Sequence, residues 1–433
     1  MAPHEPVYDR AIADLSTPAR AFATPRRVAL ASIAIALVTG VLATAGAASV
    51  PSQVGFVCTP ANALLGGGRD PACWPFATSS PWNAPIGSAA ALASSTACTR
   101  EIQDHSLYTD IASSQWSHPL YIARASDPVT ALYTTSGGGP SAYVASVHAP
   151  SGMSPADPQY PSGDAHLHIV DPTHSVAYEQ WQARRYGSGW LSTYETTTSL
   201  SGPGVGQGGV RAYGGSALGG LIRNWEIQAG AIRHPLAVAI QVDHQTDSWV
   251  WPATANDGWS RSQYTGHIPM GQLFAIPRSY GLTANGTFSL ALFKQQLGLQ
   301  TQVGTTIALA ARNYGAYLVD SGGAFSFYAE PWGTSLVAPA LNVYDPNGHT
   351  DADKIRSAMQ CVTSNSPATP GGGGAPLAPP APPLGSAPRF GPKQPGPPPP
   401  PTPHRPRPKH HHHHHHHHHR HHRHHSHRQH HRA

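Results

Sequence analysis

Short stretches in which apolar and polar residues alternate dominate the middle of this chain. The clearest are residues 119–123, 141–145 and 165–170. A strand turns successive side chains to opposite faces of a sheet, so a period of two predicts strands. Helical spacing is confined to short segments at 218–225, 287–297 and 303–313. We therefore expect a mainly β fold, a jelly-roll-like two-sheet β-sandwich with a few short peripheral helices.

Composition changes sharply along the chain and predicts its domain limits. The expected segments are a basic-ended amino-terminal region (1–27), an apolar segment (28–50), a connector with two cysteines (51–73), a globular β-rich domain (74–363), a Gly/Pro-rich linker (364–408) and a His-rich tail (409–433). Proline-dominated sequence prefers solvated polyproline II and cannot bury a core. We therefore expect the linker and the tail to be disordered.

The uncharged run from Val28 to Val50 follows Arg26 and Arg27 directly. A basic flank before an apolar segment is typical of export with the amino terminus inside. Small residues at 43–47 offer cleavage sites, but the run is also long enough to stay as a membrane anchor. A buried core helix is the weaker interpretation. We expect a secreted or cell-envelope protein that contacts the membrane if the segment is not cleaved.

Four cysteines follow the apolar segment, at Cys58, Cys73, Cys98 and Cys361. Exported proteins meet an oxidising compartment, where cysteines pair. No C-x-x-C spacing indicates zinc or redox chemistry. Of the three possible pairings, we favour Cys58–Cys73, which closes a short loop, and Cys98–Cys361, which joins the two ends of the domain.

Positive charge is concentrated in the tail. Nine Lys and Arg residues and no acid follow residue 366, whereas the whole chain carries a net charge of only +5. The rest of the chain is therefore net acidic and shows no basic, aromatic groove of the kind that binds single-stranded nucleic acid. We expect no nucleic-acid partner.

A hairpin is predicted where residues 166–170 and 176–181 flank the turn residues 171–175. Alternation predicts that one face carries His166, His168, Tyr178 and Gln180. The other face then carries Leu167, Ile169, Ala177, Glu179 and Trp181. His and Tyr side chains on a rigid sheet could transfer protons to and from a substrate, although an ordinary solvated face is the simpler interpretation. A second hairpin is expected between residues 317–320 and 325–328.

Further polar residues lie in apolar surroundings. The candidate catalytic residues are His166, His168, Tyr178, Glu179, Glu226, His234 and Asp320. Glu179 is expected on the core face, where Arg184 or Arg233 would form an ion pair with it. Partial burial would instead raise its pKa and suit it to act as a general acid. Glu226 is also explained by the last turn of its helix, whereas His234 is expected at a strand end, where sites often form.

Metal ligands are predicted in the tail. Ten consecutive histidines stand there, namely His410, His411, His412, His413, His414, His415, His416, His417, His418 and His419. Such a tract binds Ni²⁺, Zn²⁺ or Cu²⁺ with little selectivity, although neutral repeat expansion also explains it. His166-x-His168 supplies only two ligands, and no third ligand can be placed from the sequence. No other cofactor is expected.

Several local patterns resemble a family of uncharacterised exported bacterial proteins. They are Pro81-Trp82-Asn83, the run from His166 to Asp171, residues 178–185, residues 232–236, residues 250–253 and residues 314–320. These patterns span most of the globular region, so the resemblance implies one exported domain. The resemblance implies no activity.

The expected function rests on three features taken together, namely the predicted export, the β scaffold and the polar candidate residues. Trp190, Trp251, Trp259 and Trp332 stand in polar or turn-rich sequence, where indoles could stack on sugars, although plugging the ends of a sandwich explains them too. We expect a carbohydrate-active enzyme, a polysaccharide hydrolase or lyase acting on extracellular or cell-wall glycan. The alternative is a non-catalytic cell-envelope or carbohydrate-binding protein.

Overall fold

A computed structural model describes residues 53–65, 68–137, 139–156, 163–206, 208–257 and 262–385. Strands predominate in these ranges and helices are few and short, as the alternation in the sequence predicted. The apolar segment 28–50 and the histidine tract 410–419 lie outside the described residues. No helix of the described residues has the length and apolar character needed to cross a membrane.

The largest sheet has six strands in mixed directions. Its order is β18 (Gln360–Val362), β15 (Leu273–Ala275), β16 (Ala316–Ser321), β12 (Leu236–Ile240), β17 (Phe325–Tyr328) and β3 (Thr109–Ala112). Every residue of β12 is buried, which matches its unbroken apolar sequence. The second hairpin predicted from the sequence is wrong, because β12 lies between β16 and β17 and pairs with both. Two strands close in sequence need not pair when a third strand fits between them.

Two four-stranded sheets are built from residues 120–199. One has the order β11 (Tyr194–Ser199), β8 (Val176–Trp181), β7 (Leu167–Val170) and β4 (Leu120–Ile122). The other has the order β6 (Ala142–His148), β5 (Val129–Thr134), β10 (Gly189–Ser192) and β9 (Arg184–Tyr186). A separate small core with Leu132, Leu167, Ile169 and Trp190 lies between them.

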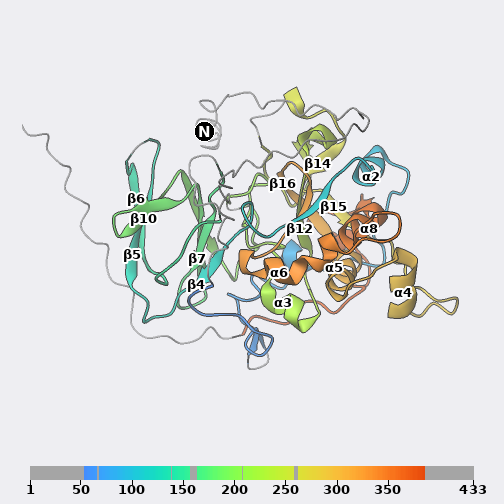
Figure 1. Cartoon of the computed structure of the whole chain (residues 1–433), viewed down its shortest axis with the longest axis horizontal. Coiled ribbons are helices and arrows are strands. Elements are labelled where there is room, and N and C mark those ends of the chain that lie inside the picture. Colours follow the sequence, from blue (N-terminus) through green and yellow to red (C-terminus); the bar gives the residue numbers. More distant parts are fainter. Residues whose placement is uncertain are drawn as a thin grey trace, which may run out of the picture. The chain divides into compact units, whose positions relative to one another are not determined.

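The two-sheet sandwich expected from the sequence is therefore not the architecture of the whole domain. The small core connects the two four-stranded sheets, whereas the six-stranded sheet packs against helices (Figure 1). Period-two alternation identifies strands but does not say how many sheets they form. The remaining strands form two ribbons, β1 (Leu64–Leu65) with β2 (Gly68–Arg69) and β13 (Gln245–Trp249) with β14 (Ile268–Met270).

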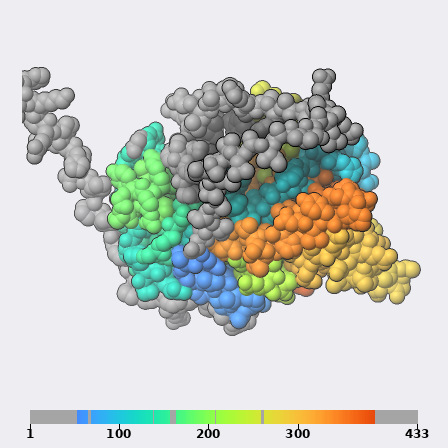
Figure 2. Space-filling view, in the orientation of Figure 1, coloured from blue at the N-terminus to red at the C-terminus, as the bar shows by residue number. Residues whose placement is uncertain are grey.

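The helices surround the six-stranded sheet. They are α2 (Ala97–Ile102), α3 (Asn224–Ala229), α4 (Leu290–Leu297), α5 (Gln302–Asn313), α6 (Thr334–Val337), α7 (Pro339–Asn342) and α8 (Asp351–Ala358). Ser289 and Thr301 cap α4 and α5 by accepting backbone N–H bonds. On the face drawn in Figure 2, the orange and yellow helical segments form a continuous surface beside the green and teal strands.

The helix expected from residue 218 begins only at Asn224. Gly219 and Gly220 interrupt the apolar spacing, and Gly220 has a φ of +71°, which a helix cannot accommodate. Residues 218–223 are therefore not helical, and Ile222 instead forms a parallel β-bridge with Ala329. The carboxyl end is as predicted, with Gly230 in the left-handed conformation at the C-cap.

The folded part of the chain extends beyond the expected limits of 74–363 at both ends. Arg69 is fully buried, and its Nε donates to Pro382 O at 2.7 Å. Gly385 N–H donates to Arg69 O at 2.9 Å, so the end of the described chain pairs with the expected connector. Proline lacks an N–H, but its carbonyl still accepts hydrogen bonds. The prediction of disorder is therefore wrong for residues 364–385, and residues 386–408 lie outside the described part.

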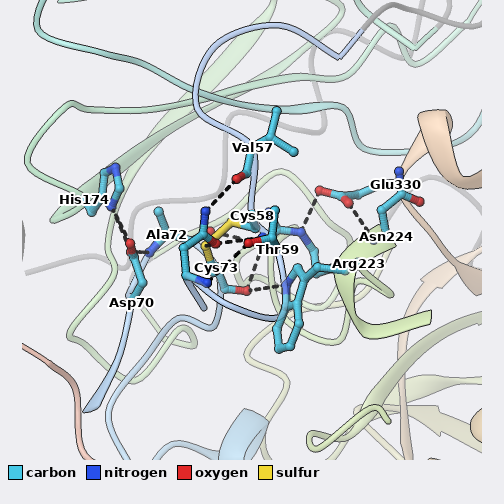
Figure 3. Close-up of a disulfide and its surroundings, with 12 residues drawn as sticks. Val57, Cys58, Thr59, Asp70, Ala72, Cys73, His174, Arg223, Asn224 and Glu330 are labelled. Atoms are coloured by element: carbon cyan, nitrogen blue, oxygen red, sulfur yellow. Dashed lines mark hydrogen bonds and ion pairs between the residues drawn. A yellow bond between two sulfur atoms is a disulfide. The ribbon is translucent and has the colours of Figure 1, made fainter. Parts of the chain in front are cut away.

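Both favoured disulfides, Cys58–Cys73 and Cys98–Cys361, are formed. Figure 3 shows the first of them beside Arg223, whose Nη1 donates to Cys73 O at 3.2 Å and whose Nε donates to Glu330 at 2.6 Å. The disulfide thus closes a loop within the amino-terminal segment, and the hydrogen bonds from Arg223 to Ala72 O and Cys73 O connect this segment to the buried Arg223–Glu330 ion pair of the core. The bridge to Cys361 joins α2 to the edge strand β18.

Candidate functional site

The register of the hairpin formed by β7 and β8 decides which side chains share a face. His168 lies opposite Glu179, and Leu167 lies opposite Gln180. Directly opposed residues point to the same side of a sheet. His168 therefore shares its face with Glu179, whereas Tyr178 and Gln180 share theirs with Leu167 and Ile169. The sequence analysis placed His166 and His168 on the same face as Tyr178 and Gln180, and this grouping is wrong. Alternation determines the faces within one strand only, whereas the turn sets the register between the two strands.

A third histidine joins His166 and His168. Leu120 of β4 pairs with His168 in a parallel register, which places His118, two residues earlier, beside His166. His118 Nδ1 lies 2.9 Å from His168 Nε2, and the rings of His118 and His166 have centroids 4.1 Å apart. All three residues are buried. We call these three residues the histidine cluster.

Burial keeps the histidine cluster uncharged. Desolvation is the main cause that lowers the pKa of each ring, and the nearby Arg211 lowers all three further. The pKa of His166 falls to about 4, although Asp164 acts in the opposite direction. At neutral pH the three imidazoles are therefore neutral, which is the form that can bind a metal ion.

Arg211 is a buried cation between the sheets. Its guanidinium carbon lies 3.8 Å from the centroid of the Tyr328 ring, and its Nη2 donates to Ala217 O at 3.2 Å. Its Nε and Nη1 have no hydrogen-bond partner within the described ranges. A buried guanidinium with donors to spare is an unusual arrangement, because unmade hydrogen bonds in a protein interior are costly. Arg211 is therefore positioned to bind an anionic or polar group.

Two carboxylates, Asp257 and Asp320, form a carboxylate pair beside Arg211. Ser321 N–H donates to Asp320 Oδ1 at 3.0 Å, and Ser321 also hydrogen-bonds Asp257. Burial is the main cause that raises the pKa of both carboxyls, and the charge of Asp257 raises that of Asp320 further. Two carboxylates that share a buried site hold a common proton more tightly than either does alone. Asp164, which also acts on both, keeps 44% of its side chain exposed.

Glu179 is completely buried and is held by neutral donors. Ser216 Oγ donates to Glu179 Oε1 at 2.5 Å, and Ala217 N–H donates to Oε2 at 2.7 Å. Burial raises the pKa of the carboxyl, while these bonds and Arg211 act in the opposite direction. The expected ion pair with Arg184 or Arg233 is not formed, since Arg184 donates to Gly137 O and Arg233 is exposed.

The remaining sequence candidates lie elsewhere. Tyr178 is half-buried against the small core between the two four-stranded sheets, on the opposite face from the histidine cluster. Glu226 and His234 pair with each other, with His234 Nε2 3.0 Å from Glu226 Oε2. His234 Nδ1 also lies 2.8 Å from Pro235 O. Both partners are buried, so this pair joins α3 to the start of β12.

The structure thus brings together His166, His168 and Asp320 from the sequence candidates and adds residues that sequence reasoning missed. The added residues are His118, Asp164, Arg211, Asp257 and Tyr328. His118 precedes a predicted strand by one residue, but nothing in the sequence shows that β4 and β7 pair in parallel. Within the described residues, the histidine cluster is the one group of three His, Cys, Asp or Glu side chains with the spacing to hold a metal ion.

Comparisons of the chain with protein-family models, with curated proteins and with solved structures found no match. Function is therefore inferred from the side chains and their surroundings.

Proposed function

We propose that this chain is an exported glycan hydrolase whose carboxylate pair, Asp257 and Asp320, performs general acid–base catalysis. One observation carries the proposal: the two carboxyls meet at Ser321 and both have raised pKa values. Glycoside hydrolysis requires one carboxylic acid to protonate the leaving oxygen and one carboxylate to act as base or nucleophile. A pair that retains one proton near neutral pH supplies both forms.

The surroundings of the pair fit this chemistry. Burial raises the pKa of Asp257 to about 6 and that of Asp320 well above its usual range, so the two carboxyls are not equivalent. Asp320 therefore keeps the proton and is the proposed acid. Asp257 is the proposed base or nucleophile. The spare donors of Arg211 would bind a sugar hydroxyl or a uronate carboxylate.

Exposed indoles near the ends of the contributing segments support a sugar substrate. Trp116 is 48% exposed and stands two residues before His118, and Trp249 is 50% exposed at the end of β13. The chain reaches Asp257 eight residues after Trp249. Aromatic faces stack on the apolar faces of sugar rings. Of the four tryptophans considered from the sequence, Trp190 is buried and Trp259 lies outside the described residues.

Export is part of the proposal. The two disulfides suit an oxidising compartment outside the cytoplasm. The apolar segment 28–50 would direct the chain there, either as a cleaved signal or as an anchor in the membrane.

The test is a screen of the full chain on purified polysaccharides for released reducing ends. We expect Asp257→Asn and Asp320→Asn each to lower kcat/KM by about 10²–10⁴-fold, because each removes one proton-transfer group. Asp243→Asn is the matched control, since 69% of its side chain is exposed. Full activity in both pair variants would exclude the pair from catalysis. Saturable binding without turnover would favour a carbohydrate-binding protein, and unsaturated products would indicate a lyase.

A further inference from the structure

We propose that His118, His166 and His168 bind one divalent transition-metal ion, with Zn²⁺ the best match to three imidazole ligands. This inference concerns binding alone and does not rest on the proposed hydrolase.

The positions of the ligand atoms are close to those that a zinc ion requires. One ring nitrogen from each histidine lies within 4.8 Å of those of the other two. A tetrahedral zinc ion with bonds of about 2.0–2.1 Å separates its ligand nitrogens by about 3.4 Å. The separation of 2.9 Å between His118 Nδ1 and His168 Nε2 is already near this value. Small rotations of the rings would complete the site without moving the strands.

The backbone holds the rings in place. His168 lies in β7 and His166 immediately precedes this strand, two residues earlier, so the two side chains point to the same face. His118 comes from the segment just before β4, the neighbouring parallel strand, whose register is set by the pairing of Leu120 with His168. A histidine pair on one strand with a third histidine from a neighbour is a rigid set of three ligands, and it leaves a fourth position for water or another group.

One buried ring nitrogen of the cluster is available to a further group, because His166 Nδ1 has no partner within the described ranges. His118 Nε2 and His168 Nδ1 also lack partners there, but they are the ring nitrogens opposite those of the His118–His168 contact and would carry the N–H groups of metal-bound rings. The short His118–His168 contact also needs a proton on one of its two nitrogens. A metal ion would accept lone pairs from both.

The charges around the cluster are compatible with a cation. Arg211 disfavours a bound cation, because its positive charge lies near enough to repel positive charge on all three rings. Asp164 favours it, since its Oδ2 lies 3.9 Å from His166 Nε2. Asp257 and Asp320 add two further carboxyls that interact with Asp164. The acidic groups thus outnumber the single cation.

Metal binding by the cluster must be distinguished from binding by the histidine tract at 410–419. The cluster exists only in the folded chain, so its ion stabilises the fold and raises Tm. A tract that binds equally well in the folded and unfolded chain leaves Tm unchanged. We therefore propose to measure Tm and bound metal on the full chain, first stripped of metal and then supplied with Zn²⁺ or Co²⁺ alone.

We expect Zn²⁺ to raise Tm of the wild-type chain by several degrees. Co²⁺ should produce the strong visible absorption of a four-coordinate site. His118→Asn, His166→Asn and His168→Asn should each abolish both signals and remove one equivalent of tightly bound metal. His267→Asn is the control, because His267 is an exposed histidine paired with Glu101 outside the cluster.

The proposal is overturned if Zn²⁺ leaves Tm of the wild-type chain unchanged and Co²⁺ gives only the weak absorption of six-coordinate sites. It is also overturned if the folded variants bind as many equivalents as the wild type. The wild-type measurements decide the question even if a variant does not fold. Because no reading depends on hydrolysis, a negative activity screen would leave this result standing.

Discussion

Glu179 offers a sharp test of how a buried carboxylate is held in this fold. Its two oxygens accept hydrogen bonds from Ser216 Oγ and Ala217 N–H, and these bonds connect β8 to the segment that follows Arg211. Burial is the main influence on the pKa of the carboxyl and raises it. Losing the charge should therefore cost little stability, whereas losing the hydrogen bonds should cost much more.

Glu179→Gln and Glu179→Ala separate these two effects. The Gln side chain keeps one oxygen for Ala217 N–H and turns its amide group towards Ser216, whose hydroxyl can accept instead of donating. We expect it to lower the free energy of unfolding by about 1 kcal/mol. The Ala side chain leaves both donors buried without an acceptor and opens a cavity, so we expect a loss of about 3–5 kcal/mol.

Urea unfolding at neutral pH, followed by tryptophan fluorescence, measures both changes. Thr197→Ala on the adjacent strand is the control, because Thr197 is exposed and should change the free energy of unfolding by less than about 1 kcal/mol. If Gln proves as destabilising as Ala, the hydrogen-bond reasoning is refuted. The negative charge facing Arg211 would then be what the fold requires.

Two other outcomes follow from the same structure. Burial raises the pKa of Glu195 from its ordinary value of 4.5 to about 8, so the folded chain keeps a proton that the unfolded chain releases. The stability that this protonated carboxyl provides should be present near pH 5 and fall as pH rises to about 8. Urea unfolding should therefore show Glu195→Gln gaining at least about 1 kcal/mol on the wild type over that range, and a constant difference would contradict it. Calorimetry should show that His410–His419 take up Ni²⁺ or Zn²⁺ with an affinity that falls as pH drops through about 6.5. A chain ending at Gly385 should lose the share of that uptake that belongs to the tail and keep only the one equivalent proposed for the histidine cluster, and equal uptake by both chains would contradict the tail assignment.

Local features were predictable because short-range physics determines them. Alternation located the strands of the hairpin, and the turn residues 171–175 marked its reversal. Ser, Thr and Gly at helix ends place the ends of α4 and α5 close to the expected limits. The favoured cysteine pairs also formed. Composition was less reliable at the domain end, where residues 364–385 pack on the fold although they are rich in Gly and Pro.

The candidate site was only partly predictable. His166 and His168 share a face because they are two residues apart on one chain, and any strand would place them so. The third histidine, His118, depends on a parallel pairing between β4 and β7, which lie almost fifty residues apart. The partners of Glu179 could not be found from the sequence, because charge complementarity suggested arginines while the fold supplied a serine and a backbone amide.

The sequence by itself determined the strands, the hairpin, the disulfides and the composition of the tail. Each of these depends on neighbouring residues or on the chemistry of a residue type. Only the tertiary structure decided the strand order, the registers and the meeting of Asp257 with Asp320 at Ser321. These depend on contacts between distant segments, where many pairings bury similar apolar area and the best packing of the whole chain selects one of them.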